Sequence, residues 1–257
     1  MGSVVTFTPS VPAISQLSAL FPADPRGPAY SIAYVHAGVT LLALGADKRI
    51  PELWQHVARA HTHDAAAQIT AATRVREGLV KASPLLGFPR AINALAALRA
   101  AVHAASPPDV AAAVYAPPRS RDSCREQKCP GEPRRVEGRG ARLFAQTYGQ
   151  HAARVQKNLD AISGDALGGF AVECIYGELL AEERLLDARE SAALVFVACV
   201  AAGAGPQAKG HMYGARNLGN SGEEIAAAVE VVRRVAEGLG MEVDWEEMEF
   251  LEKVRDW

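Results

Sequence analysis

His211 is the residue of this sequence whose type and surroundings best suit chemistry. It lies five residues after Pro206, in the stretch GPQAKGHMYGARNLGN. An imidazole exchanges protons near neutral pH and can stabilise developing negative charge, so it would serve acid–base chemistry if it faced a pocket. His56 follows Pro51 at the same spacing in the first half. The alternative for both is a core or interface histidine that is satisfied by a backbone carbonyl.

Three charged side chains of the second half are further candidate site residues: Glu178, Glu190 and Arg216. Asp187 and Glu190 have the spacing of a capping box, so Glu190 has a purely structural interpretation at a helix N-terminus. For Glu178 the alternatives are an orienting contact to His211, a bond to a cationic partner, or a solvated helix face. Arg216 could hold a substrate carboxylate through two parallel hydrogen bonds, and a surface salt bridge is its alternative.

The cysteines and the remaining histidines do not form a standard metal site. The four cysteines match no zinc pattern and suit a reducing, intracellular compartment: Cys124, Cys129, Cys174 and Cys199. Three first-half histidines are close together, but their spacing misses the helical face on which a metal site is usually built: His56, His61 and His63. We therefore expect neither a metal nor another cofactor.

Composition predicts an all-α protein. Hydrophobic residues make up 49% of the chain and aromatic residues only 6%, and alanine is abundant. Alanine favours helices and disfavours strands. The 27 basic and 29 acidic residues nearly balance, which gives no electrostatic reason to expect a nucleic-acid or membrane-surface binder. The apolar stretches 37–46 and 191–202 are shorter than the ~20 residues of a membrane span and predict buried helices.

The chain divides into four parts by composition. They are an irregular lead-in (1–28), a first helical repeat (29–104), a Pro/Arg-rich linker (105–141) and a second helical repeat (142–257). The alternative for the linker is a basic interaction tail. A shift of 155 residues aligns the two helical parts and places His56 on His211, which favours a tandem repeat of helical hairpins.

Capping signals predict where two of the helices begin. Ser221 and Glu224 have capping-box spacing, so we expect a helix from Gly222 to Gly238. Asp64 is expected to cap a helix that runs to Ala82, before a turn over 83–89 that contains two prolines.

The second half resembles the carboxymuconolactone decarboxylase-like family of the alkyl hydroperoxidase D superfamily. The matching stretch is YGELLAEERLLDARESAALVFVACVAAGAGPQAKGHMYGARNLGNSGEEIAAAV, and the first half shares VREGLVKASPLLGFPRAINALAAL. The resemblance covers roughly 30–102 and 143–238, and the two-part layout with its linker is similar to fungal members. It implies an all-helical fold in which a helical hairpin carries the site and subunits associate, here as a dimer or a trimer with pseudo-hexameric symmetry.

The resemblance also implies roles for individual residues. His211 would donate a proton or stabilise an oxyanion, and Glu190 matches the glutamate that polarises the active-site group. Glu178 and Tyr176 match the Tyr-Gly-Glu element, and Asn217 is expected to cap or turn. In an antiparallel hairpin, however, Glu190 would lie ~21 Å from the turn and His211 ~10 Å, so contact requires a steep crossing, a bridging water or a neighbouring subunit.

One departure separates this chain from the peroxidase members. They carry Cys-x-x-Cys just before the histidine, where this chain has Ala204 and Gln207. Neither residue forms a thiolate, so peroxidase activity is the least favoured of three hypotheses. The first is a cofactor-independent lyase on a small carboxylated lactone or related acid, with Arg216, Tyr176 and Asn217 near the substrate. The second is a non-catalytic helical assembly or binding protein.

The expected partners are a small carboxylic acid or lactone and further copies of the chain. We expect an intracellular protein, cytoplasmic by default, with mitochondria and peroxisomes not excluded, because neither end carries a recognisable address.

Overall fold

The computed structural model describes residues 8–116 and 133–257, and within these ranges the chain forms helices and no strands. The expected all-α class is thereby confirmed. In chain order the elements are α1 (Ile14–Ser18), η1 (Pro28–Tyr30), α2 (Ile32–Ala43), η2 (Asp47–Arg49), α3 (Ile50–Ala60), α4 (Ala65–Leu86), α5 (Phe88–Ala105), α6 (Pro108–Val114), α7 (Pro133–Tyr148), η3 (Gly149–His151), α8 (Ala152–Ser163), α9 (Ala166–Phe170), the π-helical η4 (Ala171–Leu180), α10 (Ala188–Ala201), α11 (Gly205–Asn217), α12 (Gly222–Leu239) and η5 (Glu249–Asp256).

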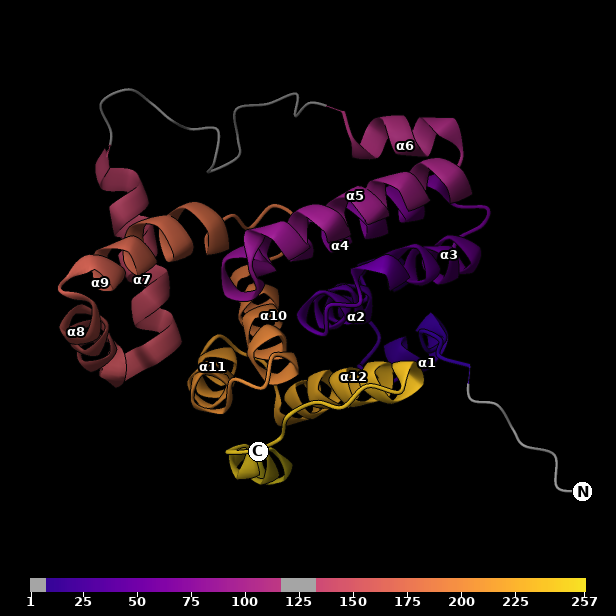
Figure 1. Ribbon diagram of the computed structural model, residues 1–257. Coiled ribbons are helices and arrows are strands. Elements are labelled where there is room, and N and C mark those ends of the chain that lie inside the picture. Colours follow the sequence, from indigo (N-terminus) through magenta and orange to yellow (C-terminus); the bar gives the residue numbers. More distant parts are fainter. Residues whose placement is uncertain (1–7, 117–132) are drawn as a thin grey trace, which may run out of the picture.

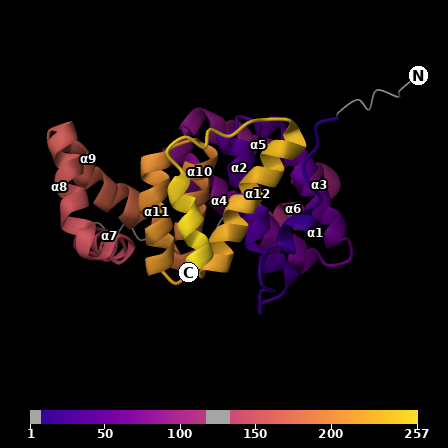
Figure 2. The same cartoon turned by 90° about the horizontal axis from the view of Figure 1, so that it is seen from below.

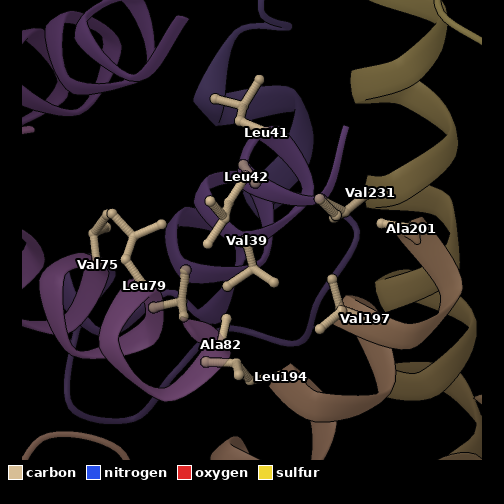
Figure 3. Packing of buried hydrophobic residues seen from close by; sticks show 14 of the residues in the cluster. Val39, Leu41, Leu42, Val75, Leu79, Ala82, Leu194, Val197, Ala201 and Val231 are labelled. Atoms are coloured by element: carbon tan, nitrogen blue, oxygen red, sulfur yellow. The ribbon is translucent and has the colours of Figure 1, made fainter. Parts of the chain in front are cut away.

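Two almost entirely buried helices, α2 and α10, form the centre of the molecule. They pack against each other, α4 contacts both, and α12 covers them from another side (Figure 1). Figure 3 shows Val39 of α2 among side chains of α4, α10 and α12, including Leu79, Val197 and Val231. This layer of small branched residues explains why both helices are apolar on nearly every face.

Helices α7, α8 and α9 lie together at one side of this body, as both ribbon views show (Figures 1 and 2). Helix α7 packs on η4 and α11, whereas α8 contacts chiefly α9 and buries none of its residues. None of the described helices is both long enough and apolar enough to span a bilayer.

Side-chain N-caps fix where helices α4, α10 and α12 begin. Both predicted capping boxes are present, with Asp187 and Glu190 at α10 and Ser221 and Glu224 at α12. Each pair satisfies two backbone donors that a helix N-terminus leaves free. The side chain of Asp64 accepts from the amide of Ala67 and caps α4, also as predicted.

The structure differs from the sequence-based boundaries in two places. Helix α4 does not end at Ala82 but continues through Pro84 to Leu86, and Gly87 then turns the chain with a φ of 98°. A proline in the last turn removes only one helical hydrogen bond, so the helix tolerates it. The expected linker 105–141 contains α6 and the start of α7; its residues 117–132 lie outside the described part.

Lys81 of α4 fastens the first half to the segment that leads into α10. Its fully buried ammonium donates to the carbonyls of Leu180, Glu182 and Leu186 at 3.2, 2.6 and 3.2 Å, and to the hydroxyl of Ser191 at 2.6 Å. The start of α10, which carries Glu190, is thereby held in place by a side chain from the other half. Helices α3 and α11 begin at the offset at which the two halves align, whereas the tandem repeat itself stays a prediction.

Candidate functional site

His211 borders a cavity of only about 10 Å³. Leu143, Tyr176 and Val195 are among the residues that close it, and the ring of Tyr148 lies 6.0 Å from the imidazole, centroid to centroid. Burial lowers the pKa of His211 to about 4. A space of this size holds at most one water molecule. In the described chain, therefore, His211 has no room beside it for a small acid.

Of the predicted partners of His211, only Tyr176 lies at the same cavity. Tyr176 is buried and donates to the hydroxyl of Tyr148 at 3.1 Å; burial raises its pKa, so the phenol keeps its proton. Glu178, two residues on, is half-buried and does not line this cavity.

The other two residues expected near the substrate have structural contacts instead. Asn217 donates to the carbonyl of Thr147 at 2.9 Å and so ties the end of α11 to α7. The guanidinium of Arg216 lies 5.7 Å from the ring centre of Trp257 and donates to the carbonyl of Asn220 at 3.3 Å. Neither residue lines the cavity beside His211.

Glu190 lies away from His211, in a buried ion cluster at the first turn of α10. One of its carboxylate oxygens accepts from Arg74 at 2.7 Å and from Arg26 at 2.6 Å, and the other accepts from the amide of Asp187 at 3.1 Å. Burial alone would raise the pKa of Glu190, but the hydrogen bonds and charges of the two guanidiniums outweigh it and lower that pKa. Glu190 is therefore an anion that two cations hold in place.

Glu190 borders a second, far larger cavity of about 530 Å³, which falls within the usual range of small-molecule sites. The lead-in segment forms one wall, and the first turns of α2, α10 and α12 form the rest. Most of the lining is apolar, contributed by Ala19, Phe21, Pro22, Ala23, Pro25, Pro28, Ile32 and Ala193. The lead-in, which the sequence predicts to be largely irregular chain, is thus part of the wall of this cavity.

His36 of α2 lies in the wall of this cavity and is 1% exposed. Among the described residues, neither of its ring nitrogens has a hydrogen-bond partner. Burial lowers its pKa to about 3; the charge of Glu190 raises it and that of Arg74 lowers it further. His36 is consequently a neutral imidazole that keeps one donor and one acceptor free, although buried polar groups are normally paired.

The charged groups around the cavity are balanced. Besides the Glu190 cluster, Arg26 donates to Asp24 at 2.8 Å and Arg189 donates to Glu224 at 2.5 Å. The side chains of Arg26 and Arg189 are both 42% exposed, and Arg189 lines the cavity, so its guanidinium can also reach a ligand that enters. An entering carboxylate would meet the guanidinium of Arg189, and the neutral imidazole of His36 lies buried in the wall beyond.

Sequence reasoning selected Glu190 but missed His36, Arg26 and Arg74. The available signal was a histidine inside the apolar stretch YSIAYVHAGVTLLALGA, because a polar residue in a buried helix is more informative than the apolar residues around it.

The described residues offer little for metal or thiol chemistry. They contain no group of three side chains able to hold a metal ion. Burial raises the pKa of Cys199 to about 12, so this thiol stays protonated, and Cys174 is exposed on η4. Cys124 and Cys129 lie outside the described residues.

Comparison with known proteins finds similarity to a protein named Peroxisomal protein 2 in two yeasts. The chain is 29% identical to that of Schizosaccharomyces pombe over 169 residues, which cover 66% of this chain and 71% of the relative. It is 29% identical to that of Saccharomyces cerevisiae over 187 residues, which cover 69% of this chain and 64% of the relative. No protein-family model and no solved structure matches the chain. Both relatives are named for an organelle inside the cell, which agrees with the expected intracellular localisation.

Proposed function

We propose that this protein is a cofactor-independent enzyme that performs acid–base chemistry on a small carboxylated lactone or related acid. We place the reaction in the 530 Å³ cavity beside His36 rather than beside His211. The observation that carries the proposal is the buried imidazole of His36 with both nitrogens unpartnered at the wall of a ligand-sized space. Unpaired buried groups of this kind are costly, and they are commonly retained where a ligand completes them.

The lining of the cavity would provide two contacts that a decarboxylation of this class requires. Arg189, which lines the cavity and is partly exposed, would hold a substrate carboxylate. His36, as the neutral tautomer that donates, would hydrogen-bond the lactone carbonyl once the ligand displaces the side chains that cover its ring nitrogens. That carbonyl takes the electron pair when carbon dioxide leaves. The apolar walls strengthen this hydrogen bond because they exclude water.

Glu190 has a positioning role in this scheme. Its carboxylate neutralises Arg74 and Arg26 and fixes the direction of the Arg26 side chain. Its negative charge also raises the pKa of His36 against the larger effect of burial. The family resemblance of the second half supports the reaction class, and Glu190 is a residue to which that resemblance gives a role and which also lines the cavity.

A second candidate is a binding protein without turnover. The pKa of His36, lowered to about 3, makes the imidazole a weak base in the empty cavity, and every charged group around it already has a partner. Such a site would bind a small acid or lactone through the same contacts and release it unchanged. A thiol peroxidase is disfavoured, because the chain lacks the Cys-x-x-Cys before His211 and the buried Cys199 stays protonated at neutral pH.

The experiment is to incubate the purified protein with γ-carboxymuconolactone and to follow carbon dioxide release and absorbance. The lyase proposal expects turnover that His36→Leu abolishes and His211→Ala retains. Saturable binding of the lactone to the wild type without product would favour the binding protein. Absence of both binding and turnover would remove this substrate class.

The names of the two relatives lead us to propose that this chain, too, resides in the peroxisome. A fluorescent fusion made at a permissive internal position should colocalise with a peroxisomal matrix marker, whereas uniform cytosolic fluorescence would contradict the assignment.

We also propose association with further copies of the chain. Helices α8 and α9 leave three apolar side chains exposed: Ile162, Leu167 and Phe170. Exposed apolar groups at one edge often mark contacts between proteins. Sedimentation equilibrium should give a mass above that of one chain, and the triple substitution of these residues to serine should reduce it.

A further inference from the structure

The decarboxylation proposed above consumes one proton in every cycle. A carboxylate that loses carbon dioxide leaves an enolate, and the enolate must take up a proton to become product. His36 cannot store that proton, because burial keeps its ring neutral. The cavity therefore needs a connection to solvent through which protons arrive.

One tyrosine of the cavity wall is hydrogen-bonded to a histidine nearer the surface. Tyr34 lies on α2, is 4% exposed and lines the cavity. Its hydroxyl lies 3.1 Å from Nε2 of His61, the residue that follows α3. His61 is only half-buried, and the residues that follow it in the turn are exposed. The Tyr34–His61 pair thus joins the cavity wall to the outside.

Two serines extend the connection along the wall. Ser18 lies close enough to the hydroxyl of Tyr34 to lower the pKa of that phenol, and the hydroxyl of Ser31 donates to that of Ser18 at 3.0 Å. Both serines line the cavity. We use the name hydroxyl row for the three hydroxyls and the imidazole that they lead to, which belong to Ser31, Ser18, Tyr34 and His61. Hydroxyl groups accept and donate at once, so such a row can pass a proton on without moving its heavy atoms.

We propose that Tyr34 and His61 are the proton inlet of the cavity, an inference that rests on the proposed function. His61 takes a proton from water and becomes an imidazolium. Its Nε2–H bond then breaks as the proton moves to the hydroxyl oxygen of Tyr34. Tyr34 at the same time releases its own proton, directly or through Ser18, to the carbon of the enolate. His61 returns to the neutral form, and no oxidation or reduction takes place.

The surroundings of both groups suit this role. Burial raises the pKa of Tyr34, and the nearby Ser18 lowers it by a smaller amount, so the phenol keeps a proton to give. Partial burial lowers the pKa of His61, and the carboxylate of Asp64 at the start of α4 raises it. Tyr34 of α2 and Asp64 are the groups that face the imidazole of His61. The side-chain amide of Gln68 on α4 donates to the backbone carbonyl of His61 at 3.0 Å.

The test compares kcat of the wild type, His61→Ala, Tyr34→Phe and His63→Ala with γ-carboxymuconolactone, in dilute buffer and with added imidazole. His63 is exposed, lies two residues from His61 and makes the matched control. We expect His61→Ala and Tyr34→Phe to lower kcat at least about tenfold with little change in KM. Added imidazole should restore His61→Ala but not Tyr34→Phe, and His63→Ala should behave like the wild type. Urea unfolding confirms that each variant is folded.

A purely structural role would give a different result. If the hydroxyl row only fastens the lead-in segment, then imidazole at any concentration will leave the defect of His61→Ala unchanged, and the inlet is refuted. A kcat of His61→Ala equal to that of the active wild type would refute it as well. An inactive wild type would instead overturn the proposed function, and the inlet with it, so the two failures are distinguishable.

Discussion

Replacing His36 by leucine should make the protein more stable while it removes the proposed chemistry. His36 is 1% exposed, and neither ring nitrogen has a partner among the described residues. An unsatisfied buried donor or acceptor costs about 1–3 kcal/mol. Leucine carries no such group and adjoins the large cavity, which leaves space for its different shape. We expect a net gain of about 1 kcal/mol in the free energy of unfolding at pH 7.

The stability advantage of His36→Leu over the wild type should grow as the pH falls. The pKa of His36 is about 3 in the folded protein, below the ~6.5 of an unfolded chain. The unfolded state therefore binds more protons between these two values, and the wild type loses stability as the pH drops through this window. Linkage gives a loss of about 2 kcal/mol between pH 7 and pH 5 from this residue. His36→Leu escapes the loss, so its advantage should rise to about 3 kcal/mol.

Urea unfolding of both proteins at pH 7 and pH 5 measures this difference. His63→Leu, at an exposed position, is the control and should change stability by less than about 0.5 kcal/mol at either pH. A His36→Leu protein that is less stable than the wild type at both pH values would show that the imidazole has a partner, and the reasoning would be refuted.

Three further substitutions test the framework around the cavity, each by urea unfolding at pH 7. Glu190→Gln breaks the buried ion pair of Glu190 with Arg74, in which the two side chains are 4% and 2% exposed, and should lower the free energy of unfolding by about 3 kcal/mol. The control Glu230→Gln breaks an exposed ion pair with Arg234 and should lower it by at most about 0.5 kcal/mol. Equal losses in these two variants would contradict the burial argument. Lys81→Met leaves four hydrogen-bond acceptors without their ammonium donor and should lower the free energy of unfolding by about 3–5 kcal/mol. A loss below about 1 kcal/mol would mean that the ammonium does not hold the segment that leads into α10. Ser221→Ala removes the cap of α12 and should cost about 1 kcal/mol, and no change would show that Glu224 caps alone.

Features set by neighbouring residues could be predicted from the sequence. The helical class follows from alanine content and periodicity, and three N-caps were predicted from the spacing of Asp64, Asp187 and Ser221. Capping is local, because the side chain and the amide it bonds lie within one turn. The extension of α4 past Pro84 was missed because a proline in the last turn costs a helix little.

The site could not be predicted in the same way, because it is built from long-range contacts. Glu190 meets Arg74 and Arg26 across the two halves, and no local spacing reports such a contact. The resemblance points to His211, whose surroundings are closed by side chains from α7, η4 and α10 and by Leu218 after α11. The apolar residues around His36 predict a buried helix, which the structure confirms. They do not indicate that a ligand-sized cavity adjoins this helix at His36.

The most direct test of the central claim is the rate of carbon dioxide release from γ-carboxymuconolactone by three proteins: the wild type, His36→Leu and His211→Ala. The cavity account predicts that His36→Leu is folded and inactive, whereas His211→Ala keeps most of the wild-type rate. Full activity in His36→Leu together with loss of activity in His211→Ala would place the chemistry at the small cavity of α11 and contradict the account.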